Sequence, residues 1–289
     1  MKMRIGAWVQ NRGELPREPG LAHLARTGEA AGFDSLTVSD HVVMPVETTS
    51  PYPFSADGVA TWDPRDPWYD AIVAMTVCAA VTTRPEIGVG VLVLPQRHPV
   101  VLAKQLASLD VVADGRVMLG VGAGWLAEEF EALGVPFRGR GARMDEWIHL
   151  LRDQWSGEPP RFEGTHYQLP PGVVAYPRPA HEIPILVGGM SPAALRRAAD
   201  ADGWFALQRV DALDPGEIDA GVATMRERRG MDAPAPRVLL RVIGDADTFA
   251  PQLPRFAAAG VTDVVVNADL TDLDEARRTY ERLRDAQDG

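Results

Sequence analysis

Eight short apolar runs, rich in β-branched residues, alternate with longer helical runs along the chain. Apolar strands that are each followed by a helix are typical of a parallel sheet covered by helices. A doubly wound open sheet shares this alternation, but the number eight and the absence of a glycine-rich turn after the first run favour a closed barrel. We therefore predict an α/β fold, a (β/α)8 TIM barrel. The predicted strands are residues 4–10, 35–41, 86–95, 117–124, 184–189, 203–208, 237–245 and 263–269.

Helix start and stop signals separate these strands. Residues 20–31 predict a helix that Gly32 closes. Asp66 followed by Pro67 predicts the start of the helix before the third strand, and Pro99 in a first turn predicts the start of the helix after it.

Two long segments interrupt the alternation. Residues 42–65 are rich in Pro, Ser, Thr and aromatic residues and have no helical period. Residues 156–183 contain several prolines and a predicted hairpin around "RFEGTHYQL". Long loops of this kind are typical of lids and binding loops. We predict one domain over residues 1–289, with these two insertions lying over the carboxyl-terminal face of the barrel.

Composition and charge exclude some classes of binding partner and indicate the cellular compartment. The formal net charge of -11 argues against general binding to nucleic acid or to an anionic membrane. The one cysteine, Cys78, lies in an apolar helical run, so we expect a core thiol and no internal disulfide. The N-terminus enters a strand without an apolar signal segment, and no run approaches the roughly 20 apolar residues of a membrane span. We expect a cytoplasmic protein with a small-molecule substrate.

The pair Asp40 and His41 follows the second strand and is the main candidate for proton transfer. Imidazole changes charge near neutral pH, and a carboxylate close to it could orient it. Functional groups of such barrels lie at the carboxyl ends of the strands. A structural alternative remains open, in which Asp40 caps a turn and His41 is a packing residue. The other histidines have no metal-ligand spacing, and we assign no metal.

Glycines mark two further strand ends. Gly188 and Gly189 follow the fifth strand, and Ser191 and Pro192 then open a helix, which is an arrangement suited to binding phosphate. A plain tight turn is the alternative. The run "GVGAGW" after the fourth strand fits no strict dinucleotide motif, so ligand contact and close packing are both compatible with it.

Taken together, several motifs resemble the bacterial luciferase-like monooxygenase superfamily, and more narrowly its branch that uses the deazaflavin coenzyme F420. They occur in order over essentially the full chain: "SDH" after the second strand, "LPQRHPVVLAKQLASLD", "DGRVMLGVGAGWLAEEFEALGVPF" and "IPILVGGMSPAALRRAADADGW".

The resemblance implies a barrel that forms a homodimer and holds F420, or alternatively FMN, across the carboxyl ends of its strands. It implies that Asp40 and His41 lie near the cofactor ring, with His41 as the acid or base. It also implies a bulge within residues 88–93, often with a non-proline cis peptide, behind the ring. The cofactor-binding residues implied are Asp40, Gly90, Val91, Leu92, Gly122, Gly124, Gly188, Gly189, Met190 and Ser191.

Trp125 departs from the pattern of the superfamily. Some deazaflavin dehydrogenases have a glutamate at this position, so Trp125 here predicts an apolar wall and a less polar substrate. We expect Trp8, Trp125 and the 42–65 loop to shape the substrate pocket. We predict hydride transfer between F420 and a small organic molecule. The alternatives are an FMN-dependent monooxygenase, a phosphate-binding lyase or isomerase, and a non-catalytic cofactor carrier.

Overall fold

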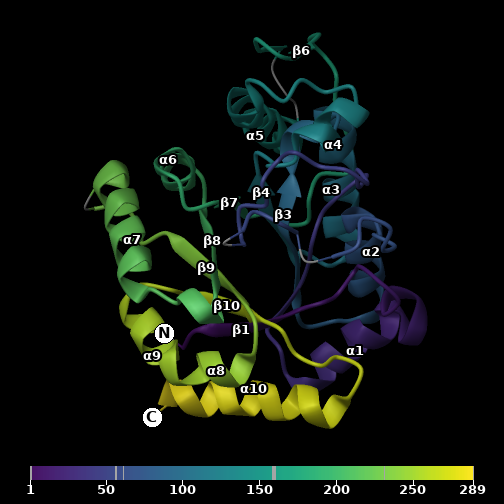
Figure 1. Cartoon of the computed structure of the whole chain (residues 1–289). Coiled ribbons are helices and arrows are strands. Elements are labelled where there is room, and N and C mark those ends of the chain that lie inside the picture. Colours follow the sequence, from purple (N-terminus) through teal and green to yellow (C-terminus); the bar gives the residue numbers. More distant parts are fainter. Residues whose placement is uncertain (1, 56, 61, 158–160, 231, 289) are drawn as a thin grey trace.

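Eight parallel strands close into a barrel in the computed structural model (Figure 1), which describes residues 2–55, 57–60, 62–157, 161–230 and 232–288. Around the barrel the order is β1-β10-β9-β8-β7-β4-β3-β2. The (β/α)8 prediction is confirmed, and each predicted strand lies where expected. The barrel strands are β1 (Arg4–Trp8), β2 (Ser35–Val38), β3 (Glu86–Val93), β4 (Val117–Gly122), β7 (Ile185–Gly188), β8 (Gly203–Arg209), β9 (Arg237–Ile243) and β10 (Asp263–Val266).

Helices surround the barrel, and α10 lies along its lower end in Figure 1. The α-helices are α1 (Leu21–Ala31), α2 (Ala71–Val81), α3 (Pro99–Val112), α4 (Ala127–Ala132), α5 (Arg140–Ser156), α6 (Pro192–Asp200), α7 (Pro215–Arg229), α8 (Ala246–Phe249), α9 (Leu253–Ala258) and α10 (Leu273–Asp288). Short helical turns are η1 (Pro16–Gly20), η2 (Leu94–Gln96), η3 (Val210–Ala212) and η4 (Ala250–Gln252). Within the described ranges, none of the helices combines the length and the apolar character that crossing a membrane requires.

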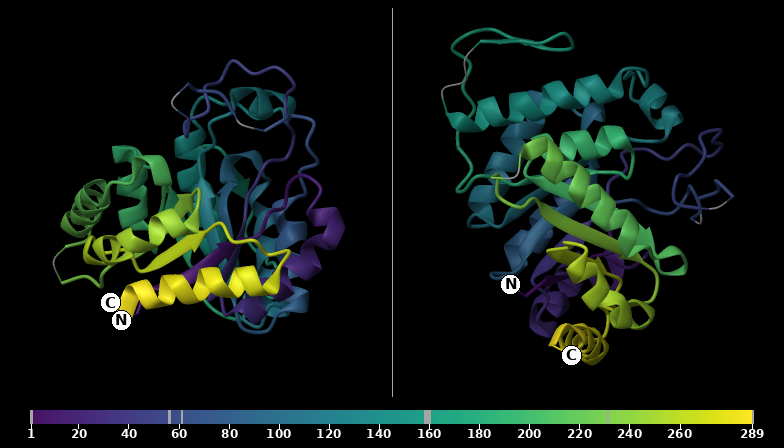
Figure 2. Two further views of the ribbon diagram at one scale, coloured as in Figure 1. Left: turned by 60° about the horizontal axis from the view of Figure 1, so that its bottom comes forward. Right: turned by 90° about the vertical axis from the view of Figure 1, so that its left-hand side faces the viewer.

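The two insertions differ in local structure. The described residues of the 42–65 loop contain no helix or strand, and Figure 2 shows this loop as long irregular dark-blue chain beyond one end of the barrel. The second insertion carries the predicted hairpin, β5 (Phe162–Glu163) paired antiparallel with β6 (Gln168–Leu169). Residues 158–160 of that insertion lie outside the described part of the chain.

The predicted start of α2 is wrong. The helix begins at Ala71, and its N-cap is Asp70, whose carboxylate accepts hydrogen bonds from the backbone of Ile72 (2.9 Å) and Val73 (3.1 Å). The preceding residues are held in a different way, since Trp68 forms an isolated bridge with Arg12. That contact keeps the end of the 42–65 loop on the barrel and delays the helix by one turn.

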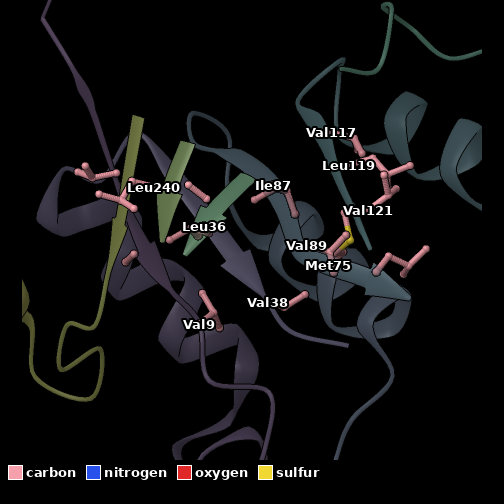
Figure 3. Packing of buried hydrophobic residues seen from close by; sticks show 14 of the residues in the cluster. Val9, Leu36, Val38, Met75, Ile87, Val89, Val117, Leu119, Val121 and Leu240 are labelled. Atoms are coloured by element: carbon pink, nitrogen blue, oxygen red, sulfur yellow. The ribbon is translucent and has the colours of Figure 1, made fainter. Parts of the chain in front are cut away.

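The hydrophobic core has two layers. Between barrel and helices, alternate strand residues such as Ile87 and Val89 pack outward, and Met75 of α2 meets them (Figure 3). Inside the barrel, β3 has glycine instead, because a Cβ on Gly88 would come within 2.5 Å of Met118. The interior cluster consists of Met118, Leu186, Phe205, Leu239 and Val265, with Trp8 and Val91 packed on it. Cys78 is buried, as predicted for a core thiol.

Candidate active site

Asn11 fixes the chain where β2 ends. Its buried side chain accepts hydrogen bonds from the backbone N–H and the hydroxyl of Ser39 (3.0 and 2.9 Å). Its amide donates to the backbone carbonyls of Ser39 (2.8 Å) and Tyr69 (2.9 Å). Since these bonds determine how the chain leaves the strand, Asp40 and His41 emerge in a defined direction at the carboxyl end of the barrel, which we call the mouth.

Asp40 is engaged within the protein. Its side chain is fully buried; one carboxylate oxygen accepts a hydrogen bond from the N–H of Val93 (2.9 Å), and the other pairs with Arg97. Burial raises the pKa of Asp40, and the charge of Arg97 opposes that rise. Burial alone would lower the pKa of Arg97, but Asp40 and Asp70 together raise it, so the guanidinium stays charged. Asp40 thus ties the end of β2 to the end of β3, and its direct part in catalysis stays a prediction.

The carboxylate that contacts His41 is Glu129 of α4, 88 residues away in sequence. His41 Nδ1 lies 3.0 Å from Glu129 Oε2, and Oε1 accepts hydrogen bonds from the N–H groups of Val42 (2.7 Å) and Val43 (3.3 Å). Burial acts to raise the pKa of Glu129, but the hydrogen bond and charge of His41 and the Val42 N–H lower it. An ionised carboxylate can only accept, so Nδ1 of His41 carries a proton. Nε2 has no hydrogen-bond partner among the described residues and is the nitrogen available to a ligand.

Three tryptophans pack around His41, and Tyr52 packs on two of them. We call these four side chains the aromatic cluster: Tyr52, Trp62, Trp68 and Trp125. The His41 ring lies 4.7 Å from Trp68, 6.2 Å from Trp125 and 6.3 Å from Trp62, between ring centroids. Tyr52 packs edge-on against Trp62 (4.9 Å) and Trp125 (5.3 Å). Such a surface keeps water from the imidazole, which strengthens its interaction with the buried carboxylate.

The 42–65 loop is fastened to α4 by Glu128. Its Oε1 accepts hydrogen bonds from the N–H groups of Thr49 (2.6 Å) and Ser50 (3.0 Å) and from the Thr49 hydroxyl (2.8 Å). The Ser50 hydroxyl in turn accepts from the N–H of Ala127 (3.1 Å). The two adjacent glutamates therefore have different partners: Glu128 binds the 42–65 loop, and Glu129 binds His41.

Replacing Glu128 by glutamine is expected to loosen this loop. Loss of one charge-assisted contact should speed limited proteolysis within residues 42–65 by about fivefold, which corresponds to an opening free energy of roughly 1 kcal/mol. Although burial acts to raise the pKa of Glu128, the hydrogen bonds from Thr49 and Ser50 lower it to about 2 from its ordinary 4.5. The carboxylate thus stabilises the loop fully above pH 4.5. As the pH falls toward 2, the wild-type loop should become as sensitive to proteolysis as the loop of Glu128→Gln. Glu131→Gln on the exposed side of α4 is the control; equal cleavage of both variants would refute the anchor.

Val91 lies at an irregularity of β3, two residues before Val93, whose N–H donates to Asp40. The peptide bond between Gly90 and Val91 is cis, and the pairing of β3 with β4 shifts register between Val89 and Leu92. The predicted bulge with a non-proline cis peptide is therefore confirmed. A Cβ on Gly122 or Gly188 would come within 2.6 or 2.7 Å of a Val91 methyl group. Glycine on β4 and on β7 makes room for the half-buried Val91 side chain. We call Val91 together with Gly122 and Gly188 the Val91 slot.

Two of the predicted cofactor contacts have packing roles. The Leu92 side chain is fully buried in the core between barrel and helices. Gly124 has a positive φ of 84°, and a Cβ there would come within 2.6 Å of Val93 and 2.7 Å of Phe130. The close-packing alternative for the "GVGAGW" run thus applies to Gly124, and any contact of Leu92 or Gly124 with a cofactor stays a prediction.

The turn after β7 has the geometry predicted for a phosphate site. β7 ends at Gly188, Gly189 takes a positive φ of 113°, and the hydroxyl of Ser191 caps α6 by accepting from the N–H of Ala194 (3.2 Å). The Gly189 carbonyl accepts from the indole of Trp204 (2.8 Å), which fixes the turn. Gly188, Gly189 and Met190 are partly exposed, so the start of α6 is accessible to an anion.

Trp8 and Trp125, the predicted pocket walls, both lie at the mouth. Trp8 ends β1 and packs on the interior cluster, while Trp125 follows β4 and belongs to the aromatic cluster. A pocket of about 340 Å³ lies between Trp125 and the long loop. Its lining consists of residues 48–52, residues 57–60 and Trp125.

The sequence matches the family described as luciferase-like monooxygenase over residues 3–247. The chain belongs to this family. An uncharacterized protein of Mycobacterium tuberculosis is 39% identical over 246 residues, which cover 84% of this chain and 83% of that protein. An F420-dependent glucose-6-phosphate dehydrogenase of Nakamurella multipartita is 36% identical over 191 residues, 64% of this chain and 51% of the relative.

The fold is also that of solved structures. The barrel superposes on an F420-dependent secondary alcohol dehydrogenase, determined in complex with an F420–acetone adduct, with a TM-score of 0.76. The two chains are 17% identical, and the alignment covers 99% of each. At that identity the likeness concerns the fold, which is the one expected of a luciferase-like monooxygenase.

Some residues at the mouth of this luciferase-like barrel were not predicted to act. Glu129 lies in the first turn of the helix after the fourth strand, within "GWLAEEFEAL", where an acidic residue also suits the helix dipole. Arg97 lies just after the third strand, and Trp62 and Trp68 lie in or next to the predicted lid. Their positions near strand ends were the available signal, but only the fold brings Arg97 to Asp40 and the other three residues to His41.

Proposed function

We propose that this luciferase-like protein is an F420-dependent oxidoreductase that transfers a hydride between the deazaflavin and a small organic substrate. The observation that carries the proposal is the His41–Glu129 pair, placed under the aromatic cluster and beside the bulged β3. Asp40, next to His41, accepts from Val93, two residues beyond Val91, so the imidazole and the Val91 slot share one side of the mouth. Similarity to an F420-dependent dehydrogenase supports the deazaflavin over FMN.

The residues present suit a planar cofactor with a phosphate-bearing side chain. Val91 offers an apolar surface against which a ring can lie, and side chains larger than glycine at positions 122 and 188 would collide with Val91. The turn from Gly188 to Ser191 would hold the phosphate through the start of α6. A bound deazaflavin would supply the hydride chemistry, while the protein supplies orientation and proton transfer.

His41 would hold and move the proton that accompanies reduction or oxidation of the substrate. Its Nε2 is the free nitrogen, and Glu129 fixes the tautomer and stabilises the imidazolium by its charge. The aromatic cluster would exclude water from the reacting groups, and Trp8 and Trp125 would contact the apolar part of the substrate.

The proposal is tested by incubating the full chain with oxidised F420 and a panel of alcohols, and with reduced F420 and a panel of carbonyl and alkene acceptors. The expected result is a change in deazaflavin absorbance that depends on both protein and substrate. The parallel assay contains reduced FMN and oxygen. Turnover only with FMN would make the chain a monooxygenase, and F420 binding without any turnover over a broad panel would favour a carrier; either outcome contradicts the proposal.

A further inference from the structure

Arg241 is a buried cation at the mouth of the barrel. It lies two residues after Leu239 on β9, and because side chains alternate along a strand, it faces the barrel interior one layer nearer the mouth. Arg241 is 7% exposed, and its guanidinium lies 5.0 Å from the centre of the Trp8 ring. It donates to the carbonyls of Val242 and Val265 and to the side-chain oxygen of Asn267.

None of these partners carries a charge, and no ion pair joins Arg241 to a carboxylate within the described ranges of the chain. Burial lowers the pKa of Arg241 to about 9. Arg237, on the same strand, gives the contrast, because it pairs with both Glu86 and Asp263 at 2.6 Å. A buried charge is costly unless it is paired. The Arg241 site is therefore an incomplete ion pair that opens toward the ligand-binding end of the barrel.

Two more arginines approach the same place. Tyr52 packs edge-on against Trp62 (4.9 Å), on which Arg12 stacks, and lies 5.5 Å from the ring of Phe54, whose carbonyl accepts a hydrogen bond from Arg209 (3.5 Å). Burial raises the pKa of Tyr52, while the charges of Arg209, Arg12 and Arg241 act to lower it. Arg12 pairs loosely with Asp66 (3.6 Å) and stacks on Trp62. Arg209 pairs with Asp211 (2.9 Å), so within the described residues Arg241 is the one of these three cations that has no carboxylate partner.

We propose that the substrate is an organic anion, with its oxyanion group bound by Arg241 and Tyr52 and its apolar body against Trp8 and Trp125. The bound oxyanion completes the ion pair that Arg241 lacks, and the neutral phenol of Tyr52 donates a hydrogen bond to it. This inference names the substrate class of the proposed oxidoreductase site and rests on that proposed function. It also agrees with an apolar wall at Trp125, because only one end of the molecule is charged.

Calorimetric titration of the full chain tests this, with and without saturating F420. The probes are benzoate and phenyl phosphate, with benzyl alcohol as the neutral counterpart, and the two anions separate carboxylate from phosphate recognition. Wild type should bind at least one anion about tenfold more tightly than the alcohol or better. Arg241→Met should lose about ten- to a hundredfold of that affinity, as expected for a charge-assisted hydrogen bond, and should leave benzyl alcohol binding unchanged.

The matched control is Arg255→Met, which removes an exposed arginine of α9 and should not alter binding. Arg241→Lys keeps the charge without the planar fork and should retain a weaker preference for anions. Because Arg241 pairs with no carboxylate of the described residues, its replacement leaves none of those acids unpaired, and a thermal melt checks folding.

The outcomes separate this inference from the proposed function. Equal affinity of wild type for anions and alcohol, or unchanged anion binding in Arg241→Met, would overturn the anion site. If Arg241→Met loses F420 and keeps the anion, the cation serves the cofactor, and the inference fails while the oxidoreductase stands. If wild type binds anions but no F420, the proposed function fails instead, and the anion can no longer be its substrate.

Discussion

Replacing His41 by alanine is expected to lower kcat by roughly 10²–10⁴-fold, the usual contribution of a positioned general acid or base. Affinity for the cofactor should stay within about twofold of wild type, because His41 is expected to meet the substrate rather than the Val91 slot. Steady-state kinetics together with a cofactor titration measure both quantities. His149→Ala, an exposed position of α5, serves as the control, and unchanged kcat in His41→Ala would remove the imidazole from the mechanism.

Glu129 acts through His41 and is therefore a positioning residue. In Glu129→Gln the imidazole loses its carboxylate partner, so kcat should fall about tenfold or more, and the part of the acidic limb of the pH profile that comes from protonation of Glu129 should disappear. The lowered pKa of Glu129 means that its carboxylate supports His41 at neutral pH and loses this effect only as the pH falls through that value. A variant with reduced stability but an unshifted pH profile would show that Glu129 only holds the loop at Val42.

Arg237→Met is expected to cause the largest loss of stability, about 3–5 kcal/mol, because it removes the cation that pairs with two carboxylates at the amino-terminal end of the barrel. Arg237 lies 2.6 Å from Glu86 and from Asp263, whose side chain is 3% exposed. Burial would lower the pKa of Arg237, but these two carboxylates raise it. Arg4 lies 3.2 Å from Glu86 and 3.4 Å from Asp263 and compensates in part, which favours the lower end of this range.

Urea denaturation measures this loss as a change in the free energy of unfolding. Arg278→Met is the matched control, because Arg278 pairs with Glu275 at an exposed i,i+3 position of α10 and should contribute less than about 0.5 kcal/mol. A loss below about 1 kcal/mol in Arg237→Met would mean that Glu86 and Asp263 find other partners or water.

The barrel could be predicted from sequence because its strands are buried on both faces. Apolar runs such as residues 237–243 and 263–266 stand out between polar helices, and their number and order leave few topologies. The start of α2 could not be located in this way. Asp66 and Pro67 have the local chemistry of a helix start, but the bridge between Arg12 and Trp68 is a contact between distant segments, and it outweighs that local signal.

The sequence predicts which residues lie at the strand ends, but it does not predict which residues of different elements pair there. His41 was identified by its place after β2, yet the residue beside it in sequence, Asp40, turns to Arg97, and the partner of its imidazole comes from α4. Arg241 lies in a strand whose apolar pattern gives no hint of a ligand. Only the closed barrel shows that it faces the mouth and that no carboxylate in the described part of the chain pairs with it.

Fluorescence titration of the purified chain with oxidised F420 and with oxidised FMN tests the central claim most directly. The Val91 slot, the Gly188–Ser191 turn and the similarity to an F420-dependent dehydrogenase lead to one expectation. F420 should saturate the protein with a Kd at least about tenfold lower than that of FMN. Tighter binding of FMN, or no binding of either cofactor, would contradict the account.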